Sequence, residues 1–167
     1  DSAAALSLLD AATKRFPASR ALVRERAQVL LVRRDYAQAA PYLESAVSTF
    51  RSDADLWRML AEAQGGLGET ARAHRAAAER FVLLGATPAA IEQLRLAQRA
   101  GQLDFYTGSQ VDARLRELQA QWQAEQKALG YTIHASVGNV SDWDSTVEAF
   151  AKAKAEPGKL NFASGGS

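Results

Sequence analysis

The chain has 167 residues, of which 47% are hydrophobic and 23% charged, so its length and composition fit one packed domain or a short array of repeats. Its net charge of +1 gives no electrostatic reason to expect a nucleic-acid partner, and no apolar run approaches the roughly 20 residues that span a bilayer. Because the sequence holds no cysteine, disulfide bonds, thiolate zinc sites and a cysteine nucleophile are excluded.

Residues 1–19 are expected to form half of a helical repeat, a second helix without its first, in the frame of the repeats that follow. The helix expected over residues 1–16 carries an apolar stripe of Ala5, Leu8, Leu9 and Ala12. A lone helix can bury such a stripe only against a neighbouring repeat. We therefore expect the natural protein to continue upstream, or a second copy of the chain to complete the half repeat in a homodimer.

A period of 34 residues runs through the next part of the chain. When residues 20–53 are aligned with residues 54–87, Ala27 falls on Ala61. Small residues at matching offsets let helices approach closely, and 34 residues is the length of a tetratricopeptide repeat, a pair of antiparallel helices. The expected helices span residues 20–33, 36–50, 54–66 and 69–84.

Residues 88–130 follow the repeats with an irregular pattern. Thr87-Pro88 places proline at the first position of a helix that Gly101 closes. A long amphipathic stretch from Ser109 to Leu129 follows and is expected to be the terminal capping helix. The sequence thus predicts an all-α, tetratricopeptide-like helical solenoid over residues 1–130.

The irregular segment resembles a known family. Its Leu103-Asp104-Phe105-Tyr106 motif and the run Ala113-Arg114-Leu115-Arg116-Glu117-Leu118 are similar to the C-terminal repeat region of periplasmic zinc metallopeptidases related to the β-barrel assembly-enhancing protease. The resemblance implies a periplasmic location. It also implies that the repeats dock substrates or the outer-membrane assembly machinery.

The zinc site of that family is missing from this chain. Family members bind zinc with a His-Glu-x-x-His helix in an N-terminal peptidase domain. The present sequence has two histidines, His74 and His134, and neither lies in such a motif. We therefore expect no catalytic residue, no metal and no cofactor here, although the parent protein would be a metallopeptidase by resemblance.

Residues 131–167 break the repeat pattern. Alternation over 131–137 predicts a strand, and a helix is expected over 142–155, so the tail is expected to be short and α/β-like. The run from Pro157 to Ser167 is similar to a stretch of periplasmic receptors of tripartite tricarboxylate transport systems. In those receptors a serine- and glycine-rich loop helps to hold a ligand carboxylate.

The candidate binding residues lie on the first helix of each repeat. In tetratricopeptide architecture the first helices line the concave face, with positions two, five and nine of each repeat turned toward the groove. Arginine is suited to such a face because its planar fork can grip carboxylates or peptide carbonyls. In the alternative interpretation Arg24 and Arg58 are solvated, or paired with Glu25 and Glu62 at little energetic gain. The predicted partner-binding residues are Arg24, Gln28, Asp55, Arg58 and Glu62.

The function predicted from these patterns is a protein–protein interaction module of a periplasmic metallopeptidase-type protein in outer-membrane protein quality control. The expected partner is a protein or peptide. Two alternatives stay open: a fragment of a periplasmic carboxylate-binding receptor, and a stand-alone repeat adaptor with no link to a peptidase.

Overall fold

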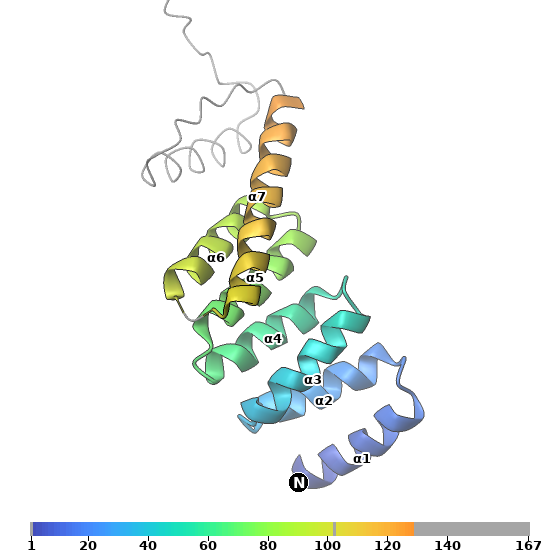
Figure 1. The fold of residues 1–167 in the computed structure, drawn as a ribbon. Helices are drawn as coiled ribbons and strands as arrows, with labels where there is room; N and C mark the ends of the chain where they lie inside the picture. Colours follow the sequence, from blue (N-terminus) through green and yellow to red (C-terminus); the bar gives the residue numbers. More distant parts are fainter. Residues whose placement is uncertain (1, 102, 129–167) are drawn as a thin grey trace, which may run out of the picture. The chain divides into compact units, whose positions relative to one another are not determined.

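The computed structural model describes residues 2–101 and 103–128, and within them every regular element is an α-helix. The chain divides into two compact units after Glu125. The helices are α1 (Ser2–Arg15), α2 (Arg20–Val32), α3 (Tyr36–Thr49), α4 (Ala54–Gly66), α5 (Thr70–Leu83), α6 (Thr87–Ala100) and α7 (Phe105–Ala128) (Figure 1).

The predicted all-α, tetratricopeptide-like solenoid is confirmed for this part of the chain. Helices α2 to α5 begin and end within one residue of the expected bounds. The strand, helix and receptor-like run predicted beyond residue 130 lie outside the described residues, and the domain boundary predicted there stays a prediction. No helix among residues 2–101 and 103–128 has both the length and the apolar content needed to cross a bilayer.

The turn between α2 and α3 and the turn between α4 and α5 have the same backbone conformation. Arg34 and Gly68, one repeat period apart, both have left-handed backbone, with φ of 56° and 76°. In the second turn the Gly68 N–H donates to the Gly65 carbonyl at 3.0 Å, and the Glu69 N–H donates to the Gln64 carbonyl at 2.9 Å. This pair of bonds satisfies the last carbonyls of a helix and reverses the chain into the next one.

Aspartates begin the helix that follows the first of these turns and the helix that follows the inter-repeat loop. Asp35 caps α3 by accepting from the Gln38 N–H at 3.3 Å. Asp53 caps α4 by accepting from the Asp55 N–H at 3.1 Å and the Leu56 N–H at 3.3 Å. Each carboxylate satisfies amides that the first turn of a helix leaves without a partner.

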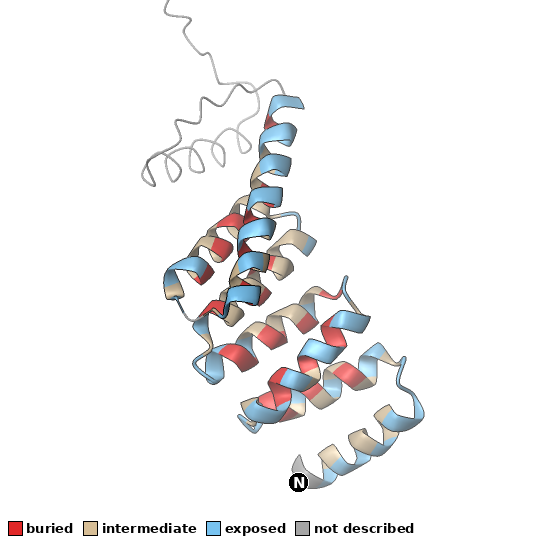
Figure 2. Cartoon of the chain, in the orientation of Figure 1, coloured by how far each residue is buried: buried red, intermediate tan, exposed pale blue. Residues whose placement is uncertain are grey.

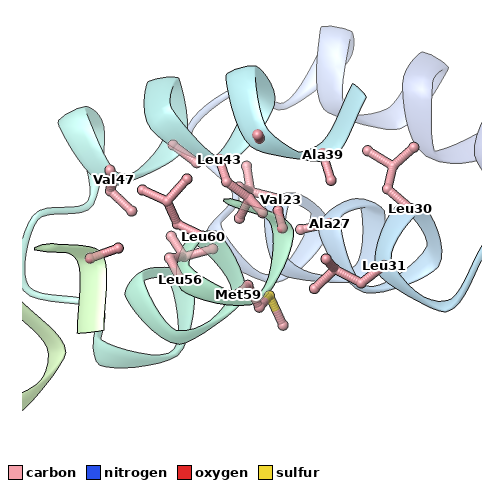
Figure 3. Close-up of a cluster of buried hydrophobic side chains, with 14 residues drawn as sticks. Val23, Ala27, Leu30, Leu31, Ala39, Leu43, Val47, Leu56, Met59 and Leu60 are labelled. Atoms are coloured by element: carbon pink, nitrogen blue, oxygen red, sulfur yellow. The ribbon is translucent and has the colours of Figure 1, made fainter. Parts of the chain in front are cut away.

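A hydrophobic core runs between α2, α3 and α4. Figure 2 shows the buried residues on the sides of these helices that face their neighbours, and Figure 3 shows the side chains in contact. Leu30, Leu43 and Leu56 are fully buried, one from each helix. Burying a leucine stabilises the fold by about 1.5–3 kcal/mol, so the apolar stripes of α2 to α4 hold the repeats together.

Close approach of α3 and α4 depends on a glycine. A Cβ placed on Gly66 would lie 2.4 Å from the Tyr36 ring, which is inside van der Waals contact. At the neighbouring Gly65 the nearest atom would be the Ala73 Cβ at 4.0 Å, an ordinary contact. The end of α4 is therefore packed directly against an aromatic ring.

One expectation about the outer helices is wrong. Helix α7 begins at Phe105, four residues before the expected start at Ser109. The Asp104 carboxylate accepts from the Thr107 amide at 2.9 Å and from its hydroxyl at 2.7 Å, so Asp104 caps the helix earlier than the apolar periodicity indicates. On α1, Leu8 of the apolar stripe is 71% exposed, so the chain does not bury the whole stripe of the half repeat.

Candidate docking surfaces

The five predicted partner-binding residues lie on α2 and α4, and each side chain is exposed or half-buried. The structure brings Arg24 and Asp55 together across the two helices, with 3.2 Å between a guanidinium nitrogen and a carboxylate oxygen. Arg58 pairs with Glu62 one turn further along α4 at 3.2 Å. Gln28 is exposed on α2.

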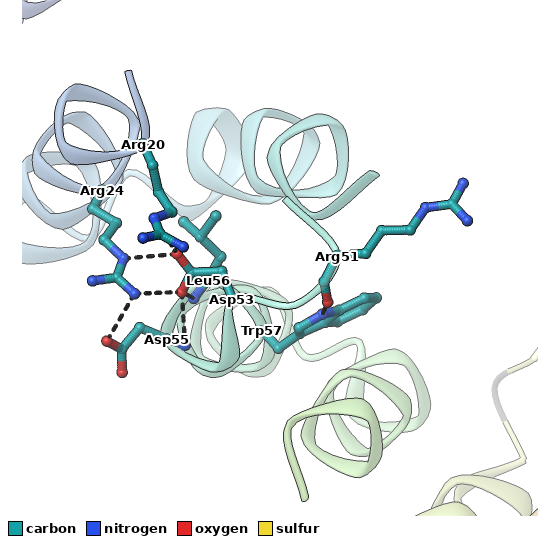
Figure 4. A network of polar contacts seen from close by, with 7 residues as sticks. All are labelled: Arg20, Arg24, Arg51, Asp53, Asp55, Leu56 and Trp57. Carbon is teal, nitrogen blue, oxygen red and sulfur yellow. Dashed lines mark hydrogen bonds and ion pairs between the residues drawn. The ribbon is translucent and has the colours of Figure 1, made fainter. Parts of the chain in front are cut away.

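Arg24 has a second and stronger partner in Asp53. Its Nε donates to Asp53 Oδ2 at 3.0 Å and its second nitrogen to Oδ1 at 2.6 Å, as Figure 4 shows. Arg20 adds a longer ion pair to the same carboxylate at 3.6 Å. Because the Asp53 side chain is fully buried, this fork ties α2 to the beginning of α4.

The electrostatics of Asp53 agree with this geometry. Burial raises the pKa of the Asp53 carboxyl, but the hydrogen bonds from Arg24 and from the Leu56 and Asp55 amides outweigh it and hold that pKa below its ordinary value of 3.8. Asp53 is therefore charged at neutral pH. Arg24 is thus already engaged by two aspartates, and a partner's carboxylate would have to compete with them.

The pair between Arg58 and Glu62 is of another kind. Both side chains are more than 40% exposed and lie on one helix face, four residues apart. Such a pair contributes about 0.3–0.5 kcal/mol to stability, so either residue can leave it and bind a partner with little loss of free energy. The alternative pairing expected for Arg58 is present in the structure, whereas Arg24 pairs with Asp53 and Asp55 instead of Glu25.

A second surface lies on the opposite side of α4 and was missed by the sequence reasoning. It is a groove of about 740 Å³, and we call it the α3–α5–α7 groove. Its lining comes from residues 44–51 of α3 and the turn after it, 57–64 of α4, 72–83 of α5 and 106–114 of α7.

Helix α4 supplies the base of the groove with Trp57, Leu60 and Gln64. Successive helical residues are turned by about 100°, so these three lie on the side of α4 away from Asp55 and Arg58. Trp57 is half-buried against the core, and its indole N–H donates to the Arg51 carbonyl at 2.9 Å (Figure 4). Trp57 therefore packs on the core and also lines the groove.

Helix α7 is held beside α5 by charged contacts. Arg114 makes a two-pronged contact with Glu79, with both nitrogen to oxygen distances at 3.0 Å. The hydrogen bond to Glu79 raises the pKa of Arg114. At the start of α7, Arg72 of α5 lies 3.7 Å from the Asp104 carboxylate.

His74 has a structural partner. Its ring Nδ1 lies 2.8 Å from the Gln93 side-chain oxygen, which connects α5 to α6. Within residues 2–101 and 103–128 no three histidine or acidic side chains come together as metal ligands. His134 lies outside the described residues.

Comparisons with known proteins agree with the repeat geometry. A family model described as tetratricopeptide repeat matches residues 20–63, which hold α2, α3 and most of α4. A stretch of 40 residues is 55% identical to part of acetoacetyl-CoA reductase from Cupriavidus necator, covering 24% of this chain and 16% of that enzyme. Together, the helix pairs and the family match identify a tetratricopeptide repeat region in this chain.

Proposed function

We propose that this chain is a docking module that binds a protein or peptide partner through its helical repeats. The observation that carries the proposal is the tetratricopeptide region itself, whose stacked helix pairs form extended surfaces. The exposed polar side chains of α2 and α4 support it further. Of these, Gln28, Arg58 and Glu62 are the proposed partner contacts, while Arg24 and Asp55 also fix the spacing of the two helices.

We propose further that the module serves a periplasmic zinc metallopeptidase-type protein in outer-membrane protein quality control. The support is the resemblance of the segment from Leu103 to Leu118. In this segment Phe105 is 92% exposed and Tyr106 is 71% exposed. Large exposed aromatic side chains are typical of surfaces that contact other proteins.

A pull-down from periplasmic extract tests the docking role. We expect the wild-type chain to retain outer-membrane assembly proteins and the Arg58→Glu variant to lose them, because the reversed charge repels an acidic partner and breaks the pair with Glu62. Arg116→Glu, an exposed position of α7 outside both surfaces, is the matched control. Equal retention by all three proteins would contradict the assignment of the face.

A homodimer is a second proposal for the partner. Leu8 is 71% exposed and Phe16 is 54% exposed, at α1 and just after it. None of the described side chains of α1 is buried. A second copy of the chain that packs on this face would bury both residues.

The receptor-fragment alternative concerns the tail and stays a prediction. Calorimetry with citrate and related dicarboxylates tests it, and absence of heat would remove it. The match to acetoacetyl-CoA reductase does not lead us to propose reductase activity. A stretch of 40 residues is at the lower limit of what folds alone, and it is 16% of that enzyme.

A further inference from the structure

We propose that the α3–α5–α7 groove binds an extended acidic peptide segment of a partner protein. This inference rests on the proposed docking function and adds to it a second surface and the chemistry of the partner. The observations that carry it are two cations without acidic partners, a buried polar atom without a hydrogen bond, and an apolar base.

The cations of the groove are not all neutralised. Its lining holds four arginines and two glutamates. Arg114 is engaged by Glu79, and Arg72 is within 3.7 Å of Glu69 and of Asp104.

The other two arginines face the groove without a carboxylate. Among the described residues Arg75 makes no ion pair or hydrogen bond, and Arg51 donates only to the Ser48 carbonyl, at 3.3 Å. A guanidinium can donate two parallel hydrogen bonds to one carboxylate, so two guanidinium groups along one groove favour an acidic ligand.

Gln64 supplies the second observation. It is 3% exposed, and its side-chain nitrogen donates to Glu44 Oε1 at 3.1 Å. Its side-chain oxygen is buried and has no hydrogen-bond partner. Turning the amide over would place that oxygen against the Glu44 carboxylate, so the contact with Glu44 fixes the orientation.

A buried acceptor without a partner is unfavourable, and because the Gln64 side chain lines the groove, a ligand that turns its oxygen toward the groove and brings a donor removes that penalty. A peptide backbone carries an N–H at nearly every residue. The phosphate backbone of a nucleic acid carries none, and the net charge of +1 gives it no attraction. Gln64 therefore favours a peptide as the acidic ligand.

The apolar surface of the groove fits side chains of such a peptide. Trp57 and Leu60 lie at its base, Val47 and Val82 line it from α3 and α5, and the exposed Tyr106 borders it on α7. Residues of an extended segment point alternately to opposite sides, so apolar ones can reach the base while acidic ones reach Arg51 and Arg75. The volume of about 740 Å³ admits a short extended segment and excludes a folded domain.

Selection from a displayed library of random dodecapeptides tests the proposal with the full chain as bait. We expect the enriched peptides to carry net negative charge and at least one large apolar residue. One enriched peptide, synthesised with a fluorescein label, is then titrated by anisotropy. Arg51→Gln and Arg75→Gln should each weaken binding about tenfold, the effect of losing a charged hydrogen bond, and Arg116→Gln should leave it unchanged.

Gln64→Leu separates binding from folding. It removes a buried unsatisfied oxygen, so the thermal midpoint of the free protein should stay or rise, while the affinity for the peptide falls. A structural role alone would lower the midpoint and leave the affinity of the folded fraction unchanged.

Three results would overturn the groove as the site: no enriched peptide, enriched peptides without acidic residues, or binding that Arg58→Gln abolishes and Arg75→Gln does not affect. The last result would leave the docking function standing on the α2 and α4 face. Equal partner retention by the wild-type chain and Arg58→Glu in the pull-down, together with intact peptide binding, would leave the groove and remove that face.

Discussion

At the scale of single residues, the contact between Gly66 and Tyr36 sets how closely α3 and α4 approach. The ring occupies the space where any other residue would place its Cβ. Gly65 precedes it in the same helix, and a Cβ there would make only an ordinary contact with Ala73 at 4.0 Å. Two adjacent glycines therefore have opposite roles, and one substitution distinguishes them.

Gly66→Ala is expected to lower the free energy of unfolding by about 1–3 kcal/mol, because the new methyl group overlaps the Tyr36 ring. Gly65→Ala, the matched control, is expected to raise it by about 0.5–1 kcal/mol, since alanine favours the helix. Urea unfolding followed by circular dichroism measures both. In the Gly66→Ala background, Tyr36→Leu should recover part of the lost free energy of unfolding, because it removes the overlapping ring. Stabilisation of both glycine variants would show that the ring does not occupy the position described.

A second residue-scale prediction concerns Asp53 and pH. Asp53→Asn keeps an N-cap but loses the charge that holds Arg24. We therefore expect the free energy of unfolding at pH 7 to fall by about 1–2 kcal/mol, and the partial exposure of Arg24 keeps this effect small. Asp55→Asn, which changes an exposed partner of the same guanidinium, should cost under about 0.5 kcal/mol.

The pKa of Asp53 is lowered in the folded state, so its stabilising contribution is fully present above its ordinary value of 3.8. That contribution is lost as the pH falls through the folded pKa. The difference between wild type and Asp53→Asn should therefore shrink below pH 3.8 in denaturant titrations. A difference that is the same at every pH would contradict the charge pairing.

At the scale of elements, the cap of α7 and its two-pronged ion pair to α5 help to position this helix. Asp104 begins the helix by binding Thr107, and these two hydrogen bonds hold the pKa of Asp104 below its ordinary value. Ten residues further on, Arg114 grips Glu79 of α5. The wall of the groove formed by α7 depends on that contact.

A double-mutant cycle with Arg114→Gln and Glu79→Gln should give a coupling energy of about 1 kcal/mol, because the pair is two-pronged and partly buried. Arg114→Lys keeps the charge and loses the fork, so it should recover less than half of the coupling. The control cycle is Gln98 with Asp112, an exposed hydrogen bond between α6 and α7. Equal coupling in both cycles would show that Arg114 contributes no more than a surface contact.

At the scale of the whole molecule, the repeat period recurs in the turns but not in the helix caps. Arg34 and Gly68, one period apart, take the same left-handed turn. Asp35 caps α3 with its side chain, whereas Glu69, at the equivalent position before α5, makes no side-chain cap bond. Each repeat then packs mainly on its neighbours, which is why the outermost helix, α1, has no buried side chain among its described residues.

If α1 meets a second copy, sedimentation velocity of the wild-type chain should show a dimer that dissociates on dilution. Leu8→Glu places a charge in that interface and should give a monomer at all concentrations, with circular dichroism unchanged because Leu8 is 71% exposed. Ser7→Glu, at an exposed neighbouring position, is the control. A wild-type chain that sediments as a monomer throughout the concentration series would contradict the homodimer.

Local patterns were enough to predict the repeat helices. Hydrophobic spacing, turn residues and the period of 34 act within a single repeat, so α2 to α5 were placed within one residue. The start of α7 was missed because apolar periodicity outweighed the Asp104-x-x-Thr107 cap in the interpretation, although that cap is readable in the sequence. The apolar stripe of α1 did not tell which of its residues meets the next helix, and Leu8 is 71% exposed.

The sequence by itself determined the repeat period, the helix pairs, and the side of α2 and α4 that carries polar residues. Only the tertiary structure decided that Arg24 is held by Asp53, and that Arg51, Gln64 and Arg75 line one groove. These contacts join residues from different helices, and their geometry depends on how the helices cross. Periodicity along one helix fixes which residues share a face, but it does not fix what that face meets.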